Sequence, residues 1–254
     1  MATASEIRVI SVYAGYEELS RAAAELFVTE CRQTVRERGR FSVVLSGGHT
    51  PRHTYELLTQ PEYARRVPWT DVHVFWTDER CVSPDDPESN QRMAHEALLD
   101  HVPIPAHQVH PILCAQHPQG AAERRELELR KFFADRTPRF DLIILGLGDN
   151  GHTASLFPGS TVLKDRERWV ADVHVPGEGP NRVTMTAPLI NQARRVVFLV
   201  SGAKKAQALH EVLEGPLDPN RLPAQLIKPT DGQLVWLVDR AAAAQLKRRA
   251  ARSR

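Results

Sequence analysis

Cysteine is scarce in this chain of 254 residues, and its scarcity excludes two kinds of framework. The three cysteines, Cys31, Cys81 and Cys114, are widely spaced and form no Cys-x-x-Cys pair. An odd number at wide spacing argues against a disulfide framework and a zinc site, and fits a reducing compartment. We therefore expect a cytoplasmic protein without structural disulfides.

Long apolar runs and a strong net charge are also missing. No window approaches 18 apolar residues, and no basic segment followed by an apolar stretch opens the chain, so we expect neither a membrane span nor a signal peptide. The formal charge is only +2, which gives no drive toward nucleic acid or membrane. Basic residues do gather at 247–254, which we interpret as a disordered C-terminal tail.

Several signatures of known chemistry are absent as well. The sequence contains no His-Glu-x-x-His, no Gly-x-Ser-x-Gly and no P-loop pattern, which argues against a zinc protease, a serine nucleophile elbow and an NTPase. It also has no repeat and no low-complexity linker. We expect one α/β domain over residues 1–246, with room for a small lobe near 160–190.

What is present is an alternation of apolar, β-branched runs with amphipathic helical segments. Near-continuous apolar strands predict an α/β fold, Rossmann-like, with a mostly parallel sheet and helices on both faces. Ligands of such sheets bind at the carboxyl ends of the strands. The pattern predicts strands at 7–13, 41–46, 71–79, 140–148, 169–175, 182–187 and 193–202, helices at 20–39, 50–59, 90–102, 121–135 and 204–215, and a strand running into a helix at 232–247.

The first loop of interest follows the strand at 41–46 and reads Ser46-Gly47-Gly48-His49-Thr50 before a helix. Paired glycines let backbone N–H groups approach an anion closely, and the helix start adds its positive dipole end. The loop predicts phosphate binding. An ordinary strand-to-helix turn explains it equally well on its own.

The second loop is rich in charge and follows the strand at 71–79. Arg80 offers a bidentate grip on a phosphate. Asp78 and Glu79 stand beside it, so the alternative is an ion-pair cluster that pins the loop.

The third loop carries Gly146-x-Gly148-x-x-Gly151, the spacing of a dinucleotide fingerprint, followed by His152. A fingerprint needs a long helix after its third glycine, whereas here a short helical segment at 152–157 is cut off by Pro158. We favour the alternative that the glycines place His152 at a strand end, where an imidazole can act as an acid–base group.

The fourth loop places two lysines at the start of a helix, after Gly202. A cation there is unfavourable against the helix dipole unless an anion occupies the site. We assign Lys204 to solvent and Lys205 to the site. Together the four loops predict a phosphorylated small molecule and acid–base chemistry.

The four loops in this order resemble the glucosamine-6-phosphate isomerase/6-phosphogluconolactonase family. The resemblance rests on "LSGGHTPRHTYELL", "WTDERCVSPDDPESN", "DLIILGLGDNGHTASLFPG", "RVTMTAPLINQARRVVFLVSGAKKA" and "LPAQLIKPTDGQLVWLVDRAA". The segment "GHTASLFPG" is similar to the lactonase branch rather than to the deaminase branch. The resemblance implies hydrolysis of 6-phospho-D-glucono-1,5-lactone without a metal or nucleotide cofactor.

The resemblance also implies residue roles. His152 would be the general base that activates water, with Asn150 beside it as a second catalytic position. The resemblance places the following residues in substrate binding: Gly47, Gly48, His49, Thr50, Asp78, Arg80, Gly148, Arg182 and Lys205.

Two positions depart from the family pattern. His49 stands where a small residue is usual, and Asn150 stands where an aspartate usually precedes Gly-His. Asn150 offers a carbonyl acceptor without charge, which lowers the basicity of the imidazole relative to a carboxylate neighbour. Asp149 is a second candidate for orienting His152.

Two other functions remain open from the sequence. One is a sugar-phosphate isomerase or deaminase on the same scaffold, and the other is a non-catalytic phosphosugar-binding regulator. For the lactonase function we expect a small-molecule phosphosugar lactone as the partner, no nucleic-acid or membrane partner, and a monomer or homodimer.

Overall fold

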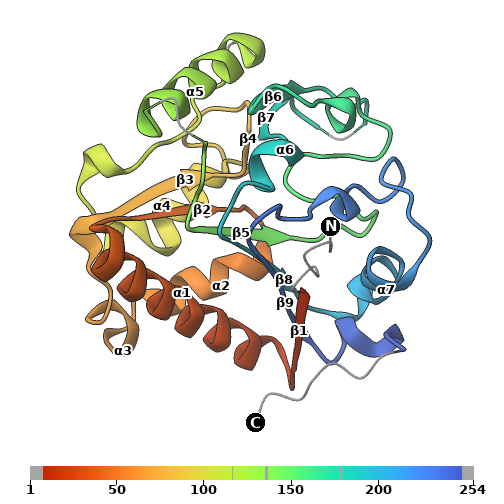
Figure 1. Cartoon of the computed structure of the whole chain (residues 1–254), viewed down its shortest axis with the longest axis horizontal. Helices are drawn as coiled ribbons and strands as arrows, with labels where there is room; N and C mark the ends of the chain where they lie inside the picture. The colour runs from red at the N-terminus through yellow and green to blue at the C-terminus, as the bar shows by residue number, and fades with distance from the viewer. Residues whose placement is uncertain (1–7, 116, 135–136, 178, 248–254) are drawn as a thin grey trace, which may run out of the picture.

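The computed structural model describes residues 8–115, 117–134, 137–177 and 179–247 (Figure 1). Of the predicted tail at 247–254, residues 248–254 lie outside the described residues, whereas Lys247 donates its backbone N–H to the Glu214 carboxylate. Among the described residues no helix is both long and apolar enough to span a membrane.

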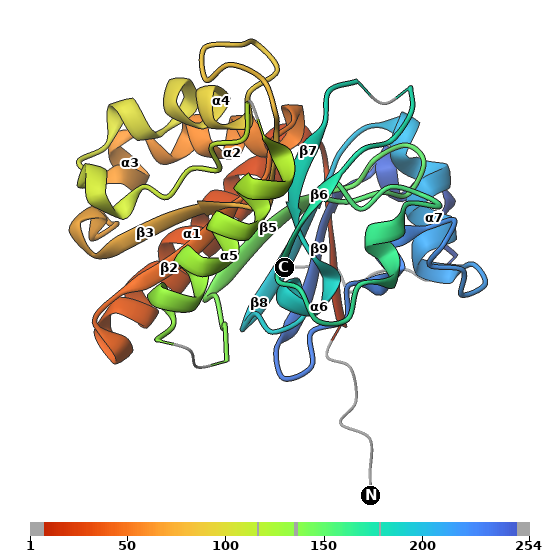
Figure 2. The same cartoon turned by 90° about the horizontal axis from the view of Figure 1, so that it is seen from above.

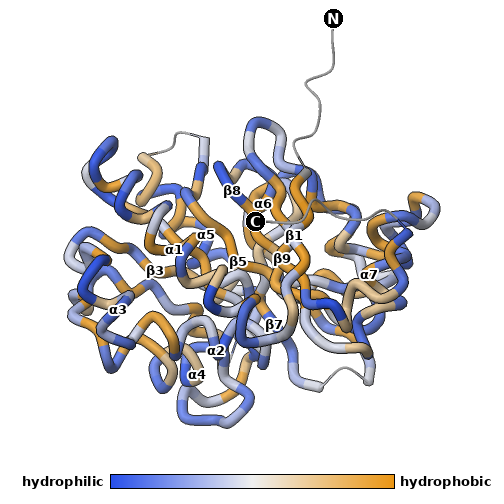
Figure 3. Tube along the Cα trace, turned by 90° about the horizontal axis from the view of Figure 1, so that it is seen from below, coloured by the Kyte–Doolittle hydropathy of each residue, from blue (hydrophilic) through white to orange (hydrophobic). Residues whose placement is uncertain are grey.

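A six-stranded sheet forms the centre of the molecule, and every neighbouring pair in it is parallel. Its strands are apolar almost throughout and run through the core, as the hydropathy colouring of β5 and β9 shows (Figure 3). The predicted mostly parallel α/β sheet is confirmed. The strands in spatial order are β1 (Arg8–Tyr13), β9 (Gln233–Asp239), β8 (Arg195–Val200), β5 (Leu142–Gly146), β2 (Phe41–Leu45) and β3 (Val72–Trp76).

Helices α1 and α2 cover one face of this sheet, and α5 lies on the other (Figures 1 and 2). The ring of Phe132 in α5 packs edge-on against the ring of Phe75 in β3, with the two centroids 4.9 Å apart. The α-helices are α1 (Tyr16–Arg38), α2 (His49–Leu58), α3 (Pro61–Ala64), α4 (Asn90–Ala97), α5 (Pro118–Phe132), α6 (Ala187–Ile190) and α7 (Ala206–Glu214). Short 3-10 turns occupy Trp69–Asp71, Leu99–His101, Ala106–Gln108, Thr161–Lys164, Ala203–Lys205, Pro223–Leu226 and Ala242–Gln245.

A second, three-stranded antiparallel sheet lies beside α5 (Figure 2). It consists of β4 (Asp78–Arg80), β7 (Arg182–Met185) and β6 (Val170–Val173). The single strand predicted at 71–79 is therefore wrong, because the chain changes sheets at Thr77. The Thr77 N–H donates to Leu45 of the main sheet, and its carbonyl accepts from Met185 of the second.

Three local expectations also fail. Residues 152–157 contain no helix, because Thr153 and Leu156 form an isolated bridge within a turn. The predicted C-terminal helix is reduced to the 3-10 turn Ala242–Gln245. Helix α1 begins at Tyr16, ahead of the prediction, since Glu17 and Glu18 in its first turn complement the helix dipole; it ends before Gly39 as predicted.

The expectation of a chain without disulfides is wrong. Cys81 and Cys114 form a disulfide across a sequence separation of 33 residues, while Cys31 is a free thiol buried on α1. Spacing rules detect local cysteine pairs, whereas here β4 and the segment before α5 bring two distant cysteines together.

Candidate active site

The candidate site lies where the strand order reverses. The chain passes from β2 outward to β3 and then returns to β5 on the other side of β2, so the loops after β2 and β5 diverge. Such a reversal opens a crevice at the carboxyl ends of the strands. A cavity of about 260 Å³ lies there, and all the predicted site residues except Asn150 line it. The remaining lining residues are Ser46, Pro51, Asn90, Gly146, Leu147, Thr153 and Ala154.

The glycine turn after β2 forms the part of the cavity wall nearest α2. Gly48 is the N-cap of α2 and has a φ of 99°, a conformation that a side chain would strain. No side chain of the described residues caps this helix end, so its first-turn N–H groups lack that partner. His49 and Thr50 occupy this first turn. The turn therefore presents backbone donors and the positive end of a helix dipole to the cavity.

Two arginines lie opposite each other on neighbouring strands of the second sheet. The β4–β7 register pairs Arg80 with Arg182 directly. The Arg80 guanidinium donates to the Glu88 carbonyl at 3.0 Å and to Asn90 Oδ1 at 2.7 Å. Arg182 lies over the ring of Phe157, 5.1 Å from its centre. Both guanidinium groups are thus held at the cavity.

Asp78 lines the cavity, but protein hydroxyls engage both of its carboxylate oxygens. Oδ1 accepts from Thr77 Oγ1 at 2.7 Å, and Oδ2 accepts from Ser155 Oγ at 2.6 Å. Asp78 is 5% exposed. These bonds tie the start of β4 to the loop that carries His152, so the geometry makes Asp78 a link between two walls of the site.

His152 is oriented by Asn150. Asn150 Oδ1 lies 2.6 Å from His152 Nδ1 and also accepts the His152 backbone N–H at 3.2 Å. Asn150 Oδ1 is an amide oxygen and can only accept a hydrogen bond, so Nδ1 must donate to it. In the neutral ring Nδ1 therefore carries the proton, and Nε2 is the basic nitrogen. Gly148 lies against the imidazole, since a Cβ there would stand 2.1 Å from Nδ1. Phe157 packs on the ring with centroids 4.5 Å apart.

Lys205 reaches the cavity, and Lys204 is exposed and does not line it. Lys205 Nζ forms an ion pair with Asp149. Asp149 is thus engaged with a lysine, while Asn150 contacts the imidazole. Of the two candidates for orienting His152, the structure brings Asn150 into position.

Sequence reasoning missed Asn90 and the role of Glu79. Asn90 Nδ2 donates to the Asp78 carbonyl at 2.9 Å while Oδ1 holds Arg80. Glu79 is buried and accepts the backbone N–H groups of Arg80, Asn90 and Gln91. Burial raises the pKa of Glu79, and these N–H donors oppose the rise. The sequence signal for these contacts was Ser89, an N-cap residue that marks the start of α4 and so places Asn90 in its first turn.

Tyr16 at the start of α1 is a third missed residue. Its hydroxyl donates to the His49 carbonyl at 2.8 Å, and its ring stacks on the His49 imidazole at 5.6 Å. Nothing in the local sequence at Tyr16 indicates this contact, because it joins positions 33 residues apart.

The fold and the cavity define a class: an α/β protein whose switch-point cavity combines a glycine turn, three basic side chains and an oriented imidazole. Such a cavity suits a small phosphorylated molecule that reacts by proton transfer. Residues 15–236 match the family described as glucosamine-6-phosphate isomerases/6-phosphogluconolactonase, and the chain belongs to this family.

Relatives of known name are similar over nearly the whole chain. A 6-phosphogluconolactonase of Synechocystis sp. is 44% identical, and the match covers 94% of this chain and 98% of the relative. A 6-phosphogluconolactonase of Nostoc sp. is 39% identical with the same coverage of both chains. Among solved structures, the Trypanosoma brucei 6-phosphogluconolactonase is 29% identical with a TM-score of 0.82, covering 95% of this chain and 100% of that one.

Proposed function

We propose that this protein hydrolyses 6-phospho-D-glucono-1,5-lactone to 6-phosphogluconate, with His152 as the general base. The observation that carries the proposal is that one cavity holds the oriented imidazole, the α2 N-terminus and three basic side chains. The names of the relatives at 44% and 39% identity support the choice of substrate.

In the proposed reaction, His152 Nε2 removes a proton from a water molecule that attacks the lactone carbonyl carbon. The tetrahedral intermediate then collapses, the bond to the ring oxygen breaks, and the imidazolium returns its proton to that oxygen. Asn150 keeps the proton on Nδ1 and stabilises the charged ring through its carbonyl dipole. No group is left covalently bound to the protein.

Binding is assigned to the remaining cavity residues. The phosphate would lie at the Gly47–Thr50 turn, where backbone N–H groups, the Thr50 hydroxyl and the His49 ring meet the Arg80 guanidinium. Lys205 adds charge at the phosphate, and Arg182 contacts the sugar ring side. Gly148 leaves room for the imidazole, and Asp78 secures the wall that carries Arg80.

The test of His152 is the variant His152→Ala. We expect kcat to fall by about 10²- to 10⁴-fold, the usual contribution of general-base assistance, with KM changed little. Product formation from freshly prepared lactone, corrected for spontaneous hydrolysis, measures it. His101→Ala at an exposed histidine outside the cavity is the matched control.

A His152→Ala protein with nearly normal kcat contradicts the role of His152. Ammonia release from glucosamine 6-phosphate by the unaltered protein would instead place it in the deaminase branch. Tight binding of 6-phosphogluconate without turnover of the lactone would indicate a regulator.

The same proposal includes the setting of the reaction. We place it in the cytoplasm, with a monomer or homodimer acting on a free small molecule and no nucleic-acid or membrane partner. Three of the rice relatives are named as chloroplastic, so fractionation of the source cells is the relevant measurement.

A further inference from the structure

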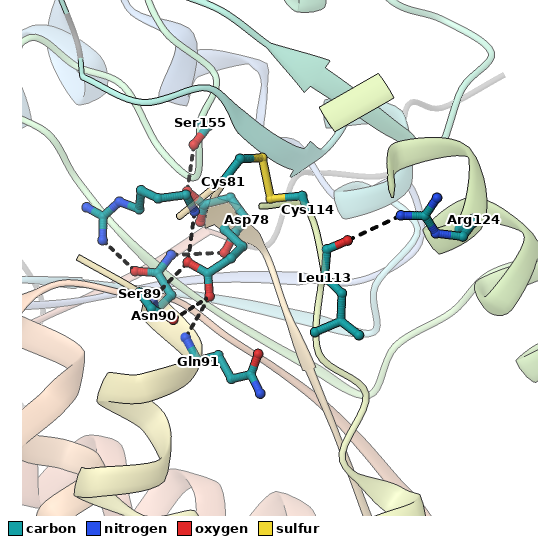
Figure 4. The surroundings of a disulfide bond; sticks show 11 residues. Asp78, Cys81, Ser89, Asn90, Gln91, Leu113, Cys114, Arg124 and Ser155 are labelled. Atoms are coloured by element: carbon teal, nitrogen blue, oxygen red, sulfur yellow. Dashed lines mark hydrogen bonds between the residues drawn. A yellow bond between two sulfur atoms is a disulfide. The ribbon is translucent and has the colours of Figure 1, made fainter. Parts of the chain in front are cut away.

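The disulfide stands directly beside a residue of the cavity. Cys81 follows Arg80 in the chain, and its partner Cys114 lies in the segment leading to α5, with the two Cα atoms 4.8 Å apart (Figure 4). Neither cysteine lines the candidate active site. The cross-link therefore joins the end of β4 to a segment that the proposed reaction does not use.

We propose that Cys81 and Cys114 form a reversible thiol–disulfide site whose oxidation state controls how firmly Arg80 is held for phosphate binding. The proposal rests on the proposed function, because it takes Arg80 as a phosphate ligand. Its reaction partner is a low-molecular-weight thiol and the corresponding disulfide.

The contacts around Arg80 show why a nearby cross-link matters. The Arg80 side chain is held by Glu88, near the end of the loop that starts at Cys81, and by Asn90, where α4 begins after that loop. Residues 83–85 of this loop are exposed, and the loop contains no helix or strand. Apart from the disulfide, the backbone bond from the Cys81 N–H to the Asn181 carbonyl, at 2.7 Å, ties its start. Breaking the disulfide leaves the loop free to sample more conformations.

A second cavity lies against Cys114, which is itself 3% exposed, and could bring a small thiol next to the disulfide. It has a volume of about 380 Å³, and Cys114, Arg80, His117 and Arg124 are among its lining residues. Arg124 reaches along this segment and donates to the Leu113 carbonyl (Figure 4). Basic side chains there favour an attacking thiolate over a neutral thiol. The cavity shares Arg80 with the active site, so the two sites meet at that residue.

The exchange balances with the named partner. A thiolate attacks one sulfur of the disulfide, giving a mixed disulfide and one free cysteine thiolate. A second thiol then attacks the mixed disulfide, which leaves two protein thiols and one small-molecule disulfide. Two electrons pass from the two small thiols to the cysteine pair, and the reverse sequence oxidises it. Cys31 stays outside this chemistry, since its burial raises its pKa to about 12.

The test equilibrates the full chain in mixtures of reduced and oxidised glutathione. Each sample is divided in two. One half is alkylated and its mass is measured to count the free thiols, and the other half is used for lactone kinetics. We expect full reduction to raise KM about fivefold while kcat stays within about twofold, since weaker placement of Arg80 reduces substrate binding. The variant Cys81→Ser/Cys114→Ser should show the high KM in every mixture. Cys31→Ala, the matched control, should respond as the unaltered protein does.

Three results overturn the proposal. One is a pair that remains unreduced across all glutathione mixtures while the chain is folded by circular dichroism. The second is reduction without a change in KM, and the third is a redox response that persists in Cys81→Ser/Cys114→Ser. Where that variant fails to fold, Cys81→Ala/Cys114→Ala, which likewise leaves neither thiol of the pair, supplies the third result.

Failure of the proposed function has a different signature. A protein that hydrolyses the lactone in neither redox state contradicts the function alone. Calorimetric titration with inorganic phosphate then tests the thiol site. The affinity for phosphate should fall about fivefold on reduction, because Arg80 is then held less firmly. An unchanged phosphate affinity overturns the thiol proposal independently of turnover.

Discussion

At the residue scale, the orientation of the His152 ring depends on Asn150, two residues earlier in the chain. Asn150 Oδ1 accepts from both the His152 ring and its backbone N–H, which fixes the ring orientation and its tautomer. An amide carbonyl provides a dipole where a carboxylate would provide a full charge. The difference predicts how the pH dependence of the reaction responds to a change at this position.

We expect Asn150→Asp to move the acidic limb of the kcat/KM profile to higher pH by about one unit, because an adjacent carboxylate stabilises the protonated imidazole. The measurement is kcat/KM for the lactone between pH 5 and 8, corrected for spontaneous hydrolysis. Asp149→Asn is the matched control, since Asp149 pairs with Lys205 and should leave the limb in place. A limb that moves in the control and not in Asn150→Asp contradicts this orientation of His152.

At the element scale, β3 is an edge strand that the molecule covers with its own chain. Val109 forms a parallel bridge with Val74, and the His110 N–H donates to the Val74 carbonyl at 2.9 Å. The His110 ring stacks on Phe75 at 4.3 Å and lies 3.2 Å from a nitrogen of His73. Covering the edge in this way prevents pairing with another chain.

The covering segment makes the fold acid-sensitive. Burial, with the charges of Arg125 and the neighbouring His73 and His107, lowers the pKa of His110 to about 4. The unfolded chain takes up the proton near pH 6.5, whereas the folded chain does so only near pH 4. The contribution of His110 to stability is therefore complete above about pH 6.5 and is lost as the pH falls toward 4.

We expect His110→Phe to reduce the loss of unfolding free energy between pH 7.5 and 4.5, because phenylalanine keeps the ring stacking and cannot bind the proton. Urea unfolding at the two pH values measures this loss. The exposed His101→Phe is the control and should lose as much stability as the unaltered protein. An equal loss in His110→Phe would show that other groups cause the acid sensitivity.

At the scale of the whole molecule, one end of the central sheet forms the cavity and the other carries contacts that stabilise the fold. The carboxyl ends of β2 and β5 open into the cavity. Near their other ends, the buried Asp141 carboxylate accepts from the Ser42 N–H at 2.8 Å and from its hydroxyl at 2.7 Å. It also pairs with Arg38 of α1 at 3.0 Å. This carboxylate joins two strands to a helix far along the chain.

We expect Asp141→Ala to lower the free energy of unfolding by about 2–4 kcal/mol, because it leaves buried donors without an acceptor. At a temperature where the variant is folded, kcat and KM should stay within about twofold of normal. Urea unfolding and lactone kinetics give the two numbers. Asp231→Ala removes an 86%-exposed carboxylate paired with Arg139 and should cost at most about 0.5 kcal/mol. A large change in KM for Asp141→Ala would contradict the separation of the two ends.

Local sequence patterns specify the elements with strong periodicity and the loops that follow them. Apolar β-branched runs specify strands such as β5 and β8 whatever their neighbours in the sheet. The anion-binding character of a glycine turn before a helix also depends only on residues close in the sequence. The same local chemistry indicated Gly47, Arg80, His152 and Lys205 before any fold was known. The early proline after Gly151 also indicated that no long helix follows the glycines, and residues 152–157 contain none.

Which distant residues meet depends on the folded arrangement of the elements. The transfer of the chain between sheets at Thr77 sets Arg80 opposite Arg182, and Asn90 reaches Arg80 from the next helix. The disulfide likewise joins cysteines that no spacing rule connects. Periodicity records which face of a segment is buried, and it carries no information on which other segment buries it. The pairing of Asn150 rather than Asp149 with His152 belongs to the same category, since the course of the turn decides which side chain faces the ring.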